Sequence, residues 1–167
     1  DHGPPVILSA AIKAIQHHPD VNFTLCGDES IINPAIQVLS DAERRRVVVS
    51  HCDQVVDMGE APTSALRHKK RSSMRKAIEL VQAKEAHACV SAGNTGALLT
   101  LSFYLLKTLS GIDRPALVSM MPTASHHKVL LLDLGANVNC TPDILFQYGV
   151  MGSVLAQQVA GIASPRV

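Results

Sequence analysis

The hydrophobic positions of this chain alternate between a helical and a strand-like spacing. After the prolines at 4 and 5, apolar residues recur at helical spacing until the residues 17–20 (HHPD) end the helix. Residues 21–26 alternate as in a strand, and residues 28–39 predict a helix with Asp28 as its cap. The β-branched run 46–50 predicts a second strand.

A polar gap separates these elements from the next helix. Residues 51–68 show no clear period and predict a long loop, a feature that is often functional in a compact domain. Ser72 or Ser73 is expected to cap a helix that runs to about residue 83. Residues 87–91 then predict a short buried strand.

The rest of the chain continues the same order of elements. Residues 95–109 are apolar nearly all round a helix, which predicts deep packing. Strands are expected over 115–121 and 129–133, joined by a hairpin-like turn, and a final helix begins at Thr141. The alternation predicts a single α/β domain over 1–167, with three α/β/α layers and a mainly parallel sheet. Ligands of such sheets collect at the carboxyl ends of the strands.

Composition narrows the function classes. Apolar residues make up 47% of the chain and aromatics 3%, so Ala, Val, Leu and Ile must build the core. A net charge of +1 gives no indication of a nucleic-acid surface. The four cysteines lack zinc-site spacing, so we expect no metal, and Cys26 and Cys89 are expected to be buried in a reducing cytosol. Residues 143–162 are too polar for a membrane span, and no signal peptide is visible.

The segment SAGNTG, from Ser91 to Gly96, joins the expected buried strand to the next helix. Gly93 and Gly96 permit close backbone approach and positive φ, while Asn94 and Thr95 supply polar side chains. Free N–H groups at the helix start favour a phosphate or a carbonyl oxyanion. A tight turn with an ordinary cap explains these residues equally well, because the spacing matches neither a Walker loop nor G-x-G-x-x-G.

A second strand end, LLDLGANVN, carries Asp133, Gly135, Asn137 and Asn139. Asp133 can orient a donor, accept a proton or bind a metal, and its structural alternative is to cap N–H groups of the turn. We favour a site role, since the carboxyl ends of neighbouring strands should bring these loops together.

A third candidate is the basic stretch RHKKRSSM, from Arg67 to Met74, directly before a predicted helix. Lys70 and Arg71 can supply charge to a phosphate, with Ser72 and Ser73 at the helix start. A solvated basic loop is an equally good interpretation.

Taken together, the segments 58–74, 90–98, 114–117, 132–138 and 151–167 resemble the bacterial phosphate acyltransferase family, PlsX. The opening residues DHGP are similar to the tail of that family's Met-Gly-Gly-Asp motif. The resemblance runs along the whole chain in order but covers only the first half of such a protein. We therefore expect this chain to be the N-terminal part of a longer enzyme.

The resemblance implies that acyl carrier protein delivers an acyl thioester to inorganic phosphate, and that the acyl phosphate formed feeds phospholipid synthesis. It also implies a fold similar to phosphotransacetylases and isocitrate or isopropylmalate dehydrogenases, a homodimer, and no cofactor. The expected location is the cytoplasm, with peripheral association at the inner face of the membrane left open.

Phosphate must attack a thioester carbonyl, so an anion cradle and an oxyanion stabiliser are needed rather than a protein nucleophile. We assign catalytic roles to Asn94, Asp133 and Asn137. The residues expected to bind substrate or phosphate are Ser91, Gly93, Thr95, Gly96, Gly135, Asn139, Lys70, Arg71, Ser72 and Ser73.

Two other functions stay open. A phosphotransacetylase-like enzyme would use the same chemistry with a coenzyme A thioester. Alternatively, the chain is a fragment without catalysis that serves only as a binding or dimerisation domain.

Overall fold

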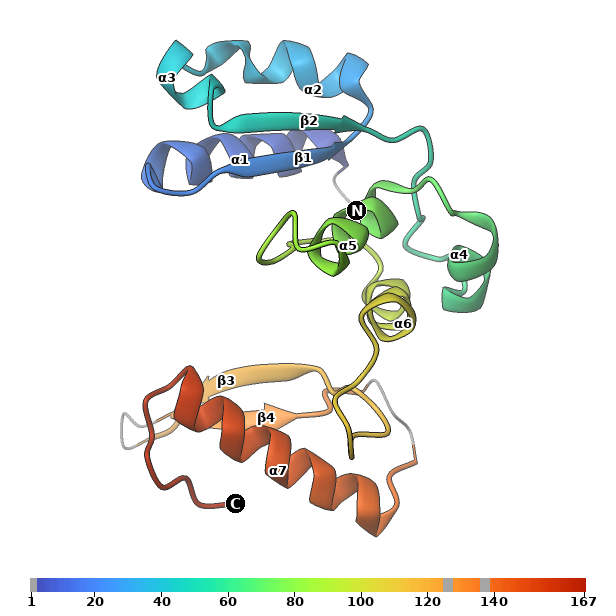
Figure 1. The fold of residues 1–167 in the computed structure, drawn as a ribbon, viewed down its shortest axis with the longest axis vertical. Coiled ribbons are helices and arrows are strands. Elements are labelled where there is room, and N and C mark those ends of the chain that lie inside the picture. The colour runs from blue at the N-terminus through green and yellow to red at the C-terminus, as the bar shows by residue number, and fades with distance from the viewer. Residues whose placement is uncertain (1–2, 125–127, 136–138) are drawn as a thin grey trace. The chain divides into compact units, whose positions relative to one another are not determined.

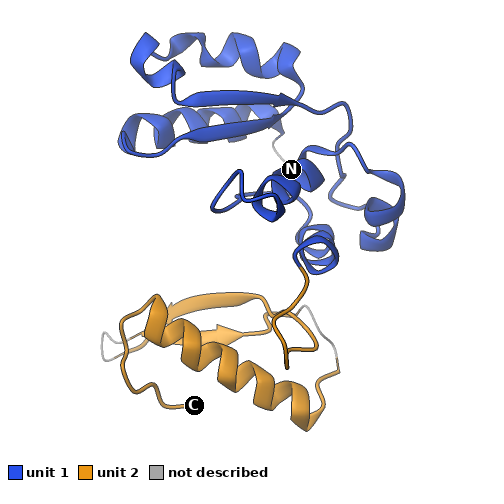
Figure 2. Ribbon diagram, viewed as in Figure 1, with its two compact units in different colours: residues 1–106 blue, residues 107–167 orange. Residues whose placement is uncertain are grey.

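The computed structural model describes residues 3–124, 128–135 and 139–167, and the chain divides into two compact units. The first unit covers residues 1–106 and the second residues 107–167 (Figure 2). Both units contain helices and strands, which confirms the α/β class (Figure 1). None of the helices in these described ranges is long and apolar enough to cross a membrane.

The first unit begins with a small parallel sheet. Strands β1 (Phe23–Gly27) and β2 (Val47–His51) pair from Phe23 opposite Val47 to Gly27 opposite His51. This pair lies beside two α-helices and a 3-10 helix (Figure 1). They are α1 (Pro4–His17), α2 (Glu29–Ala35) and η1 (Ile36–Val38). Their apolar faces share one core with the pair, which contains Leu8, Ile15, Ile32, Ile36 and Leu39.

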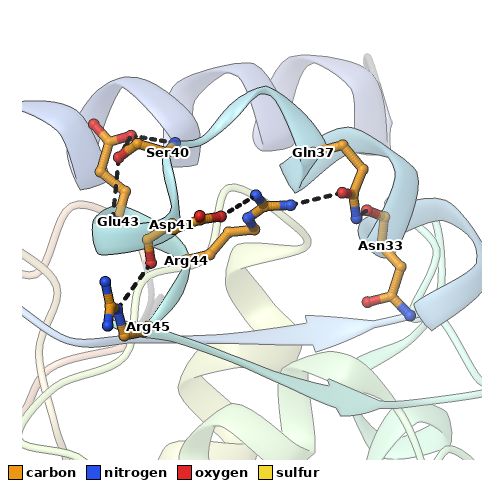
Figure 3. A network of polar contacts seen from close by, with 7 residues as sticks. All are labelled: Asn33, Gln37, Ser40, Asp41, Glu43, Arg44 and Arg45. Carbon is orange, nitrogen blue, oxygen red and sulfur yellow. Dashed lines mark hydrogen bonds and ion pairs between the residues drawn. The ribbon is translucent and has the colours of Figure 1, made fainter.

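Local capping signals explain where these helices begin. The Asp28 carboxylate accepts the Ser30 N–H at 2.9 Å, which confirms the predicted cap of α2. A short helix, α3 (Asp41–Arg44), was not predicted, although Ser40 and Glu43 form a capping box at its start (Figure 3). The S-x-x-E pattern in the sequence is the signal that could have identified it.

Three further helices form a second core within the first unit. They are α4 (Pro62–His68), α5 (Ser73–Gln82) and α6 (Thr95–Leu106). The prediction of an unstructured loop over 51–68 is therefore wrong for residues 62–68, where Pro62 begins α4 at a position that proline favours. The shared core contains Val56, Ala65, Met74, Ile78, Ala97, Leu101 and Leu105.

Two expectations for the segment around α6 are wrong. Residues 87–91 form no strand, and the Val90 side chain is 96% exposed. A strand needs a hydrogen-bonded neighbour, and no described segment pairs with these residues. The helix α6 ends at Leu106 and buries only Ala97, Leu101 and Leu105, while Phe103 and Tyr104 are exposed.

The second unit is a hairpin with one helix. Strands β3 (Val118–Pro122) and β4 (Lys128–Leu132) pair antiparallel, as expected for a hairpin-like connection. The helix α7 (Pro142–Gln158) begins after Thr141, whose hydroxyl accepts the Ile144 N–H at 3.4 Å, and it packs on β4. The pair β1–β2 agrees with the expected parallel sheet, whereas a continuous three-layer sheet in a single domain stays a prediction.

Candidate functional site

Asn94 is the central residue of the turn that precedes α6. Its side chain is nearly buried, and Oδ1 accepts the Ala97 N–H at 2.9 Å. Nδ2 donates to the carbonyl oxygens of Asp57, Met58 and Glu60 at 3.0, 3.0 and 2.8 Å. One amide group therefore caps α6 and ties the loop 57–60 to it. The structure gives Asn94 a positioning role, and direct contact with substrate stays a prediction.

Gly93 and Gly96 are explained by close packing. A Cβ atom on Gly96 would lie 3.0 Å from Pro62 Cγ, and one on Gly93 would lie 3.0 Å from Met74 Cε. Neither glycine has a positive φ, so that part of the expectation is wrong. These contacts place the turn against the first residues of both α4 and α5.

The start of α6 presents donors at the surface. Thr95 and Gly96 are exposed, and their backbone N–H groups have no acceptor in the described part of the chain. The Ser91 hydroxyl is half-buried and accepts the Gly93 N–H at 3.2 Å. Unpaired N–H groups at a helix start attract negatively charged groups, so this turn can accept an anion.

The basic stretch contributes side chains with different environments. Lys70 is exposed, whereas the Arg71 guanidinium pairs with Asp53 at 2.8 Å. Ser72 is fully buried, and its hydroxyl accepts the Arg75 N–H at 3.4 Å as the cap of α5. Phosphate contact by Ser72 stays a prediction and would require its hydroxyl to leave this cap.

Ser73, the fourth predicted residue of this stretch, is half-buried, and its backbone N–H donates a hydrogen bond to the Gln54 carbonyl oxygen at 3.2 Å. Its neighbour Met74 lies against Gly93. The structure thus brings together three segments that are distant in sequence: the loop 57–60, the start of α5 and the turn 91–96.

The other predicted turn lies in the second unit. Asp133 has a φ of 63°, its N–H donates to the Leu117 carbonyl at 2.7 Å, and its carbonyl accepts the Gly135 N–H at 2.9 Å. Its carboxylate accepts the Cys140 thiol at 3.4 Å. Gly135, with a φ of 83°, and Asn139 are both exposed. Asn137 lies outside the described residues, and a joint site of this turn with residues 91–96 stays a prediction.

Comparison with known proteins decides the family. A model of the family described as fatty acid synthesis protein matches residues 1–167. The chain belongs to this fatty acid synthesis protein family. It is 54% identical over 167 residues to a phosphate acyltransferase from Pseudoalteromonas atlantica, and 51% identical over 170 residues to one from Halorhodospira halophila. Both matches use all of this chain and cover 49% and 48% of the relatives, so the chain spans about half their length.

Within this member of the fatty acid synthesis protein family, the site residues assigned from sequence include neither Glu60 nor Lys69, although Lys69 lies in the basic stretch from Arg67 to Met74. The Glu60 Oε2 atom lies 3.7 Å from Lys69 Nζ, and Glu60 Oε1 accepts the Ser64 hydroxyl at 3.0 Å. The only signal in the sequence was an acidic residue several positions before the basic stretch, and sequence alone did not show that its side chain meets Lys69 at the other end of α4. Glu60 belongs to the loop 57–60 that meets the turn, and Lys69 directly follows α4 as its C-cap residue.

The cysteines of this family member are poor nucleophiles. Burial, followed by the influence of Cys52, raises the pKa of the Cys26 thiol from 9.0 to about 11. Burial likewise raises the pKa of the Cys52 and Cys89 thiols. Cys26 and Cys89 are only partly buried, so the expectation that both are buried is wrong in degree, whereas Cys52 is buried. The thiolate is the reactive form, so these side chains stay protonated and inert at neutral pH.

Cys26 is therefore expected to alkylate roughly 100-fold more slowly in the native protein than in urea at about pH 8, since its thiolate fraction falls with the two-unit rise in pKa. Mass spectrometry after timed iodoacetamide treatment measures both rates. The raised pKa also means that Cys26 favours the native state below pH 9.0, and that this contribution is lost as the pH rises towards about 11. Equal labelling rates in the two states would contradict the burial of this thiol.

Proposed function

We propose that this chain is part of a phosphate acyltransferase that moves an acyl group from acyl carrier protein to inorganic phosphate. The acyl phosphate product would supply phospholipid synthesis. The family match and the names of the relatives support the reaction class. The observation in the structure that supports it most is the exposed start of α6, where two N–H donors are held in place by the Asn94 network.

The chemistry agrees with such a site. A phosphate oxygen attacks the thioester carbon, the carbon–sulfur bond breaks, and the thiol leaves with a proton from phosphate. No covalent enzyme intermediate is required, so the protein must hold the anion and stabilise the developing oxyanion. In our proposal Thr95 and Gly96 contribute backbone donors, and Lys70 and Arg71 add positive charge.

The remaining predicted residues complete this proposal. Asp133, Gly135, Asn137 and Asn139 would line a second wall of the site. We further propose that the whole protein has three α/β/α layers, forms a homodimer, and works in the cytoplasm or at the inner face of the membrane. The likeness to phosphotransacetylase and isocitrate or isopropylmalate dehydrogenase folds is part of the same proposal.

The test is an assay of the full-length protein with inorganic phosphate and two thioesters of the same acyl chain, one on acyl carrier protein and one on coenzyme A. Trapping with hydroxylamine detects the acyl phosphate. We expect product from the carrier protein thioester, and activity that a chelator does not reduce. Product from the coenzyme A thioester alone would favour a phosphotransacetylase-like enzyme. No product from either would favour a binding or dimerisation role.

A further inference from the structure

A partly buried ion pair lies beside the Asn94 network. The Glu60 side chain is 14% exposed and the Lys69 side chain 29%, and Oε2 and Nζ are 3.7 Å apart. Oε2 is buried and accepts no hydrogen bond from any described residue. The free-energy cost of removing two charged groups from water offsets most of the stabilisation that their attraction provides. An ion pair of this kind is therefore weak evidence for a purely stabilising role.

Lys69 differs from its neighbours Lys70 and Arg71. The Arg71 guanidinium is bound to the Asp53 carboxylate by Nε at 3.0 Å and by a terminal nitrogen at 2.8 Å, while Lys70 is exposed. The Lys69 ammonium lies 3.7 Å from Glu60, a distance longer than a hydrogen bond, and donates to no other residue that the structure describes, so its three N–H donors remain available to a ligand. Lys69 therefore combines a fixed position, partial access to solvent and uncommitted donors.

Short contacts connect this pair to the start of α6. The Glu60 carbonyl accepts the Asn94 amide at 2.8 Å, and Asn94 caps α6 through the Ala97 N–H. Pro62, two residues after Glu60, packs against Gly96. The backbone that carries Glu60 is thus fixed relative to the first turn of α6.

We propose that Lys69 binds inorganic phosphate and that Glu60 is the positioning residue that holds its ammonium in place. This inference rests on the proposed function and names the cation of its phosphate site. Neutralising Glu60 would also remove a repulsion on the anion, and the buried Oε2 atom is screened little by salt. The two effects oppose each other, and we expect free rotation of the four-carbon Lys69 side chain to be the larger, so that phosphate binding weakens.

The experiment measures KM for inorganic phosphate, KM for the acyl carrier protein thioester, and kcat in the full-length enzyme. We expect Lys69→Met to raise the phosphate KM by at least about tenfold and Glu60→Gln by about threefold to tenfold, with the thioester KM changed less than about twofold. Lys69→Arg should recover part of the loss. Lys13→Gln, which removes an exposed positive charge on α1, is the control and should match the wild type.

The double variant separates positioning from independent binding. If Glu60 acts through Lys69, Glu60→Gln adds nothing to the phosphate KM of Lys69→Met. If the fold-changes in phosphate KM of the two single variants multiply in the double variant, the positioning role is overturned. An unchanged phosphate KM in Lys69→Met would overturn the whole inference. If thermal unfolding shows that Glu60→Gln is not folded, the two Lys69 variants still test whether Lys69 binds phosphate. A wild-type enzyme that forms no acyl phosphate would instead remove the proposed function itself.

Discussion

Asn94→Ala is expected to lower the free energy of unfolding by about 2–4 kcal/mol and the turnover of the full-length protein by at least about tenfold. The change removes the cap on the Ala97 N–H and the donors to three carbonyl oxygens in the loop 57–60. Loss of these bonds releases both the first turn of α6 and the backbone of Glu60, so the proposed anion site loses its shape together with its stability. Urea unfolding and acyl phosphate formation measure the two effects.

Two further variants test this explanation. Asn94→Asp keeps an acceptor for the Ala97 N–H but turns an oxygen towards the three carbonyls, so we expect it to be at least as unstable as Asn94→Ala. Asp28→Ala removes only the exposed cap of α2 and should cost about 1 kcal/mol. If Asn94→Ala costs no more than Asp28→Ala, the link to the loop contributes little. If its turnover equals that of the wild type, the turn does not belong to the site.

Arg46→Ala is expected to lower the free energy of unfolding by about 2–3 kcal/mol. The Arg46 guanidinium donates to the carbonyl oxygens of Ile15, His18 and Val21 at 2.7, 2.9 and 2.7 Å. A single side chain at the start of β2 therefore satisfies carbonyls at the end of α1 and in the turn to β1. A positive charge also interacts favourably with the end of a helix, which adds to the effect.

The neighbouring Arg45 gives a matched control. Arg45 is exposed and makes one long contact, from Nε to the Asp41 carbonyl at 3.3 Å, so Arg45→Ala should change stability by less than about 0.5 kcal/mol (Figure 3). Arg46→Lys keeps the charge but cannot reach three carbonyls, and we expect it to recover only a minor part of the loss. Urea midpoints compare the three variants. Similar losses for Arg45→Ala and Arg46→Ala would contradict the proposed carbonyl clamp.

Elements with strong local signals were predictable from sequence. The cap at Asp28, the β-branched run of β2 and the Thr141 start of α7 all act through neighbouring residues, and the structure confirms each of them. The prediction of a strand over residues 87–91 is wrong for the opposite reason. These residues are largely apolar, but a strand also requires a hydrogen-bonded partner, and pairing is a property of the fold rather than of a short segment.

The sequence by itself determined the α/β class and the family resemblance and singled out the turn 91–96 as a candidate site, because hydrophobic spacing, capping residues and motif order are local information. Only the tertiary structure showed that the Asn94 side-chain amide donates hydrogen bonds to the backbone of residues 57–60, and that Glu60 and Lys69 form an ion pair beside it. These contacts join residues more than thirty positions apart, or depend on how a loop folds back onto a helix. Packing decides such contacts, and residue type and spacing do not encode them locally.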